Sequence, residues 1–253
     1  MSKFGISRLG ARGVQPQTLA QAMGCEYWRK VASIRPQNLI RYLPLWEWVT
    51  PNNYDYSGLG DHATGVGVDP ITSNPEGAHF GLQFTGEPSH INLLSAEFTA
   101  HFNGAEGSLF LWGKAATAGQ WTDGAFRFLV NIQVDANNLL DIFKHLNNTT
   151  VWMRLINQGV ANQLFYVDIN PGVAWFNLGL TWSKSANQFK GYYCGAQKGL
   201  TGTITNDFTG ALMLALLGAQ DNAAGNPWLG YLAHVALWNV PLNASEMKSL
   251  GEV

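Results

Sequence analysis

The feature that most constrains this chain is a run at positions 125–135 in which apolar and polar residues alternate. The apolar members on one face are Phe126, Phe128, Val130, Ile132 and Val134. The polar members, mostly on the other face, are Arg127, Asn131, Gln133 and Asp135, with Leu129 as the exception. A period of two over this length is typical of a β-strand with one buried face.

Similar short runs recur along the chain at intervals of roughly 8–14 residues, separated by Gly, Asn, Asp and Pro. We expect further strands at 39–45, 79–85, 90–94, 97–103, 108–113, 138–146, 150–157, 163–168, 174–182, 189–195, 210–217 and 229–239. Many short strands with turn residues between them predict an all-β fold, a two-sheet antiparallel sandwich, rather than βαβ units. A chain of 253 residues can form such a sandwich as a single domain.

Helical patterns are confined to the two ends of the chain. Apolar residues at spacings of three and four predict an amphipathic helix over 17–33, which Pro36 ends. This helix could pack on the sandwich or dock on a partner, and the pattern favours neither. Near the other end, Asn243 followed by Glu246 matches a capping box and predicts a short C-terminal helix.

Three groups of segments carry a resemblance to a known family. In chain order they are 39–47 with 54–60, 80–86 with 96–102, and 175–182 with 214–218 and 228–246. They resemble the opening strand and turn, the central strand pair and the closing strands of the laminin-G-like jelly roll in the concanavalin A-like lectin/glucanase superfamily. The resemblance implies a jelly-roll sandwich. His234 and Ala236 depart from the family pattern, which usually has an acid and an arginine at these places.

Charge is split between two parts of the chain, although its sum is only −2. Residues 1–41 hold seven basic and one acidic side chain, a net +6, and the remaining 212 residues hold eight basic and sixteen acidic side chains, a net −8. This predicts a basic arm at 1–38 attached to a mildly acidic sandwich at 39–253. The arm residues expected to bind a partner are Arg8, Arg12, Arg29, Lys30 and Arg35. An acidic surface of a neighbouring subunit is the favoured partner, and specific nucleic-acid binding is not expected.

The acidic residues form no catalytic pair. Glucanases of the superfamily place two carboxylates on alternate residues of one strand, whereas no Glu here has an acid two residues away. Nucleophile motifs and clusters of His and Cys are also missing from the sequence. We therefore expect no enzyme activity, no catalytic residue, no cofactor and no zinc site. Membrane insertion is not expected either, because the longest apolar run, at 211–217, is far shorter than the about 20 residues of a membrane helix.

Asp55, Asp61 and Asp69 are weak candidates for calcium ligands, because they lie in one Gly-rich stretch and carboxylate oxygens bind calcium. We favour the alternative that Asp55 caps the turn that follows it and that the other two acids are solvated. Cys25 and Cys194 form no spacing motif, and we expect free, partly buried thiols rather than a disulfide.

Tryptophan is the strongest remaining signal for binding. An exposed indole can stack on a sugar ring or anchor a protein interface. The candidates at or beside expected loops are Trp112, Trp121 and Trp228. The tryptophans within expected strands, which we expect to pack in the core, are Trp46, Trp152, Trp175, Trp182 and Trp238.

The functional prediction rests on a conflict between the resembled family and the N-terminus. Residues 1–20 lack the apolar core of a signal peptide, whereas domains of this family usually work outside cells. A protein of a virus particle would resolve this conflict, because it is made in the host cytoplasm without a signal peptide and leaves the cell by lysis. We therefore predict a non-catalytic structural, decoration or attachment protein of a bacteriophage virion, which forms homo-oligomers or contacts other virion subunits and could bind cell-surface glycans. The alternative is a carbohydrate-binding lectin-like module, and a glycoside hydrolase on the same fold is less favoured.

Overall fold

We describe the protein from a computed structural model. The described residues are 26–45, 52–71, 81–146, 149–169 and 171–252, and for 26, 52, 70–71 and 160–168 the description covers the backbone alone. Within these residues, no helix is both long enough and apolar enough to cross a membrane.

Two eight-stranded antiparallel sheets form the body of the described chain. The first sheet has the spatial order β14 (Ala196–Gly202), β13 (Gln188–Tyr193), β12 (Phe176–Ser183), β7 (Glu106–Ala115), β16 (Leu229–Trp238), β5 (Gly81–Thr85) and β4 (Val68–Ile71), with β1 (Leu39–Leu43) also paired to β16. The second sheet has the order β11 (Val160–Asp168), β10 (Thr150–Asn157), β9 (Asn138–Lys144), β8 (Arg127–Asp135), β15 (Leu214–Leu217), β6 (His90–Asn92), β3 (Ala63–Val66) and β2 (Asn52–Asn53). This confirms the predicted two-sheet jelly-roll sandwich.

The main core lies between the two sheets and draws alternate residues from both. In β10, for example, Val151, Met153 and Leu155 are fully buried in this core, while the residues between them are half-buried on the other face. Burial of one side chain of this kind contributes about 1.5–3 kcal/mol, so the repeated alternation supplies most of the driving force for the sandwich.

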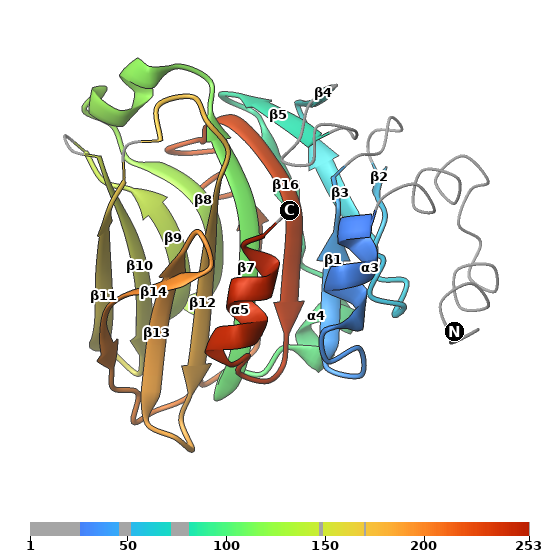
Figure 1. The fold of residues 1–253 in the computed structure, drawn as a ribbon, viewed down its shortest axis with the longest axis vertical. Coiled ribbons are helices and arrows are strands. Elements are labelled where there is room, and N and C mark those ends of the chain that lie inside the picture. Colours follow the sequence, from blue (N-terminus) through green and yellow to red (C-terminus); the bar gives the residue numbers. More distant parts are fainter. Residues whose placement is uncertain (1–25, 46–51, 72–80, 147–148, 170, 253) are drawn as a thin grey trace.

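Two helices cover the outer face of the first sheet, as Figure 1 shows. These are α3 (Glu26–Ser33) and α5 (Ala244–Leu250), and a second apolar cluster joins them to β7 and β16. Tyr27 donates a hydrogen bond to the Leu250 carbonyl at 2.5 Å and accepts one from the Trp112 indole at 2.9 Å. The described end of the predicted N-terminal helix therefore packs on the sandwich. The capping box predicted at α5 is confirmed, because Asn243 and Glu246 cap each other's backbone N–H groups.

The other two described helices close the sandwich instead of covering a sheet. Phe98 of α4 (Ala96–His101) and Trp121 of the 3-10 helix η1 (Ala118–Thr122) both enter the main core. Of the helices that the structure describes, none therefore lies over the outer face of the second sheet.

Residues 97–103 were expected to form a strand, and this prediction is wrong because α4 occupies most of the segment. Ser95 accepts a hydrogen bond from the Phe98 N–H at 2.9 Å, and a serine in this position starts a helix. The alanines and Glu97 that follow favour helix over strand. The prediction also missed the strands β2, β3, β4 and β14, which are short or lack buried alternation.

Apolar and polar residues do alternate at 125–135, but the set of positions that faces the core changes at Leu129, the residue that interrupts the alternation. The register between β8 and β9 shifts between Phe128 and Val130, which is the mark of a β-bulge. Leu129 and Val130 consequently both pack in the core, whereas Phe126 and Phe128 do not belong to it. The bulge turns these two phenylalanines onto the outer face of the second sheet.

Candidate functional site

The acids considered for calcium do not gather into a metal site. One carboxylate oxygen of Asp55 accepts the N–H groups of Tyr42 and Ser57, each at 2.9 Å, and the other accepts the Ser57 hydroxyl at 2.6 Å. Asp55 therefore caps the turn, as favoured. Asp69 is exposed on β4. Among the described residues, no group of three or more His, Cys, Asp or Glu is arranged to hold a metal ion.

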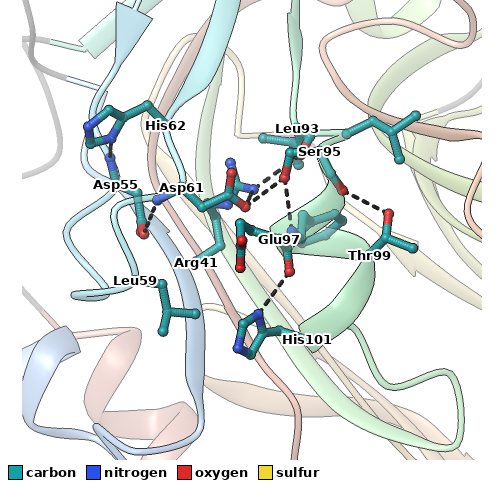
Figure 2. A network of polar contacts seen from close by, with 12 residues as sticks. Arg41, Asp55, Leu59, Asp61, His62, Leu93, Ser95, Glu97, Thr99 and His101 are labelled. Carbon is teal, nitrogen blue, oxygen red and sulfur yellow. Dashed lines mark hydrogen bonds and ion pairs between the residues drawn. The ribbon is translucent and has the colours of Figure 1, made fainter.

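Asp61 was expected to be solvated, but it is buried in the polar network of Figure 2. Its carboxylate pairs with the fully buried Arg41 and accepts the Ser95 hydroxyl at 2.9 Å. Arg41 also donates to the Leu93 carbonyl at 3.2 Å and lies 4.9 Å from the ring centre of Phe98. Burial lowers the pKa of Arg41, although the neighbouring acids oppose this change. The network ties β1 of the first sheet to the edge of the second, which is a structural role.

The three tryptophans expected to offer an exposed indole are all buried, so this prediction is wrong. Exposure is 5% for Trp112, 1% for Trp121 and 0% for Trp228. Trp112 lies under α3, where it contacts Tyr27. Because η1 folds over the end of the sandwich, Trp121 turns inward, donates to the Gly172 carbonyl at 2.8 Å and lies 6.1 Å from Trp228 between ring centres.

Two of the five basic residues assigned to partner binding contact the chain's own C-terminal segment. The Lys30 ammonium donates to the Glu252 carbonyl at 2.5 Å, and Arg35 pairs with Glu246 at 2.7 Å. Arg29 is exposed on α3. Arg8 and Arg12 lie outside the described residues, as do Cys25 and Trp46. Cys194 is a free thiol, but it is exposed where partial burial was expected.

A cavity of about 270 Å³ opens on the outer face of the second sheet. The residues that line it are Phe126, Phe128, Phe143, Arg154, Gln220 and Asn226. Phe128 and Phe143 stack with ring centres 4.9 Å apart, and Phe126 meets Phe143 edge to face at 5.8 Å. This combination of aromatic rings, two amides and a guanidinium makes the cavity a candidate ligand site.

The loop between β15 and β16 forms one wall of the cavity and is held to the sheet by hydrogen bonds. Asn131 donates to the Gln220 carbonyl at 2.6 Å, and the Phe128 N–H donates to the Asn226 carbonyl at 3.0 Å. Within the loop, Asp221 accepts the N–H groups of Ala223 and Gly225 at 3.0 and 2.9 Å. These bonds fix the backbone that carries the two amides, and the Asn226 amide NH₂ donates to the Gln220 amide oxygen at 2.5 Å, which orients both side chains before any ligand arrives.

A buried ion pair lies at the floor of the cavity. Arg154 binds both carboxylate oxygens of Asp141, at distances of 2.5 to 3.2 Å, and its guanidinium carbon lies 5.3 Å from the ring centre of Phe143. The Asp141 side chain is 1% exposed, whereas that of Arg154 is 28% exposed. Burial raises the pKa of Asp141 to about 6, and the hydrogen bonds and charge of Arg154 oppose this rise without cancelling it.

The residues of this site were not recognised from the sequence. Trp152 was assigned to the core, but it is half-buried and stacks on His145 at 4.2 Å, next to the cavity residue Phe143. The alternation within β10 could have indicated this position, because Trp152 lies on the same face of the strand as Arg154 and on the opposite face from the core residues. Asp141 carried a second signal, since it is an acid with two apolar residues on either side of it in the strand.

Comparisons with known proteins find a shared fold without a shared family. No family model matches the chain, and no curated protein is detectably related to it. Among solved structures, domain 4 of AbnA, an extracellular GH43 arabinanase from Geobacillus stearothermophilus in complex with arabinotriose, matches with a TM-score of 0.62 and 17% identity, over 85% of this chain and 98% of that domain.

Two further structures resemble the chain over about half of their length or less. The ligand-binding domain of botulinum neurotoxin serotype D, in complex with N-acetylneuraminic acid, has a TM-score of 0.65 and 15% identity, over 88% of this chain and 52% of that domain. Trypanosoma rangeli sialidase, in complex with sialic acid, has a TM-score of 0.65 and 13% identity, over 94% and 39%. The chain therefore shares the β-sandwich fold of these structures.

Proposed function

We propose that this protein is a carbohydrate-binding, lectin-like module that binds a sugar residue in the cavity on the outer face of the second sheet. The observation that carries the proposal is the half-buried ring of Phe126, which lies at the cavity with the amides of Gln220 and Asn226 and packs against the buried ring of Phe143. Aromatic rings pack on the C–H face of a sugar, and amides exchange hydrogen bonds with its hydroxyl groups. This alternative now has more support than the virion protein predicted first.

The size of the cavity agrees with a small ligand. Pockets that bury drug-sized molecules have volumes of about 300–1,000 Å³, and this cavity of about 270 Å³ lies just below that range. A sugar residue of about 12 non-hydrogen atoms, bound at about 0.3 kcal/mol per atom, gains about 4 kcal/mol, which corresponds to a Kd of about 1 mM. None of the six lining residues carries a carboxylate, so the site is suited to binding and not to the two-carboxylate hydrolysis of glycosides.

Saturation-transfer NMR with a panel of monosaccharides and disaccharides tests this function, because it detects binding in the millimolar range. We expect Phe126→Ala to abolish the signal of the bound sugar. Tyr231→Ala is the matched control, since Tyr231 is also a half-buried aromatic residue but lies on the first sheet. The proposal fails if the folded protein binds no sugar in the panel, or if the Phe126 variant binds as well as the control variant.

A virion protein remains the second candidate function, with the split of charge between residues 1–41 and the rest of the chain in its favour. In this case the protein is made in the host cytoplasm, and Arg8 and Arg12 contact neighbouring subunits. Deletion of residues 1–25 would then abolish sedimentation with particles from the native source while leaving the fold intact. A chain that never sediments with particles contradicts this candidate. The division at residue 38 and the narrower laminin-G-like resemblance stay predictions.

A further inference from the structure

Arg154 is the one charged side chain among the residues that line the cavity, and its charge is neutralised by the carboxylate of Asp141. Asp141 occupies the Nε and Nη2 donors of the guanidinium. Because the Asp141 side chain is 1% exposed, water screens the ion pair on the side of Arg154 and hardly on the side of Asp141. The remaining N–H groups of Arg154 are held in one orientation by the carboxylate and by the ring of Phe143.

We propose that Asp141 determines the specificity of this site, by neutralising Arg154 so that the cavity binds uncharged saccharides in preference to carboxylated ones. The inference rests on the proposed function and goes beyond it by naming the ligand class. It also sets this site apart from the sialic acid complexes among the similar structures, whose ligand is an acid.

The physical reason is the competition of two anions for one cation. A sugar carboxylate that reached Arg154 would share its guanidinium with Asp141, and two carboxylates this close repel each other. A sugar hydroxyl at the same place accepts a hydrogen bond from Arg154 and adds no charge. The other polar groups of the lining, Gln220 and Asn226, are uncharged amides that also suit hydroxyl groups.

The neighbourhood of Asp141 shows that its charge can be removed with little structural change. Asn131 lies directly opposite Asp141 in the register of β8 and β9. Its side-chain oxygen is buried and has no hydrogen-bond partner among the described residues. An asparagine at position 141 has the shape of the aspartate, and its NH₂ group can donate to that oxygen. We therefore expect Asp141→Asn to fold.

The experiment compares matched pairs of methyl glycosides, each a neutral hexose and its uronic acid, at pH 7.5. We expect the wild-type protein to bind the neutral member about tenfold more tightly, and Asp141→Asn to bind the uronic acid about tenfold more tightly than the wild type does. Asp135→Asn is the control, because it removes the same charge from an exposed position near the end of β8. The double variant Asp141→Asn/Arg154→Gln should lose the gain.

Each outcome of this comparison has one meaning. If the wild-type protein binds no member of any pair, the proposed function fails and the inference fails with it. If the wild type binds neutral sugars but binds the uronic acids equally well or better, the inference alone is wrong, whether or not the Asp141 variant folds. A folded Asp141→Asn protein with unchanged preference also overturns the inference and leaves the proposed function intact.

Discussion

The buried carboxyl of Asp141 makes the stability of this protein depend on pH in an unusual direction. Burial raises its pKa from the ordinary 3.8 to about 6, a rise of about two pH units. At 1.36 kcal/mol for each unit, the charged form costs the folded state about 3 kcal/mol. Between pH 4 and pH 6 the folded protein holds a proton that the unfolded chain releases, so this carboxyl makes the folded state less stable as pH rises.

Asp141→Asn isolates this effect, because asparagine does not titrate and Arg154 stays charged throughout. We expect the free energy of unfolding of the wild type, minus that of the variant, to fall by about 2 kcal/mol between pH 4 and pH 7. Urea unfolding followed by tryptophan fluorescence at several pH values measures both terms. Asp135→Asn serves as the control. A difference that is flat or that rises with pH would refute the reasoning.

Three further changes test the core, a turn and the ion pair of the exposed Asp123 with the buried Lys144 by urea unfolding. Trp121→Ala should destabilise the protein by about 3–5 kcal/mol, because the indole is fully buried at the closed end of the sandwich; a loss below 1 kcal/mol would contradict its placement. Gly218→Ala should cost about 3 kcal/mol, since Gly218 has a φ of 80° and a Cβ there would overlap the ring of Phe84; an unchanged urea midpoint would contradict this. Burial alone would raise the pKa of Asp123, but hydrogen bonds from Lys144 and Arg127 outweigh it and lower the pKa. Asp123→Asn should therefore cost about 1 kcal/mol at pH 7, because water screens this exposed carboxylate, and less as pH falls below the ordinary pKa of 3.8, where the unfolded chain takes up the proton before the folded protein does; an equal cost at pH 7 and pH 3 would contradict it.

The sandwich could be predicted from sequence because its evidence is local. The alternation of apolar residues in β8 and β10 and the capping pair Asn243 and Glu246 each depend on residues a few positions apart. The prediction failed where a single contact decides the local structure. Ser95 converts 97–103 into a helix by capping it, and β14 is so exposed that it shows no buried alternation.

The candidate site could not be predicted, because it is made by contacts between distant parts of the chain. Whether Trp121 is exposed depends on how η1 folds over the core, which no spacing in the sequence encodes. The bulge next to Leu129 is visible as a broken alternation, but its consequence, the turning of Phe128 to the outer face, depends on the pairing with β9. The loop carrying Gln220 reaches this face from 89 residues away, through its bond to Asn131.

The ion pairs of this protein differ in what they hold together, and the difference is in keeping with the site proposed on the second sheet. Arg41 and Asp61 join the two sheets, and Lys144 and Asp123 hold the loop after η1 to the end of β9. The pair of Asp141 and Arg154 connects β9 to β10, which are already joined along their whole length by backbone pairing. It adds no connection and leaves a carboxyl whose pKa is raised by burial. A costly polar pair that adds no connection, set beside an aromatic cavity, is what the proposed binding function leads us to expect, because binding sites depart from the arrangement that is best for stability.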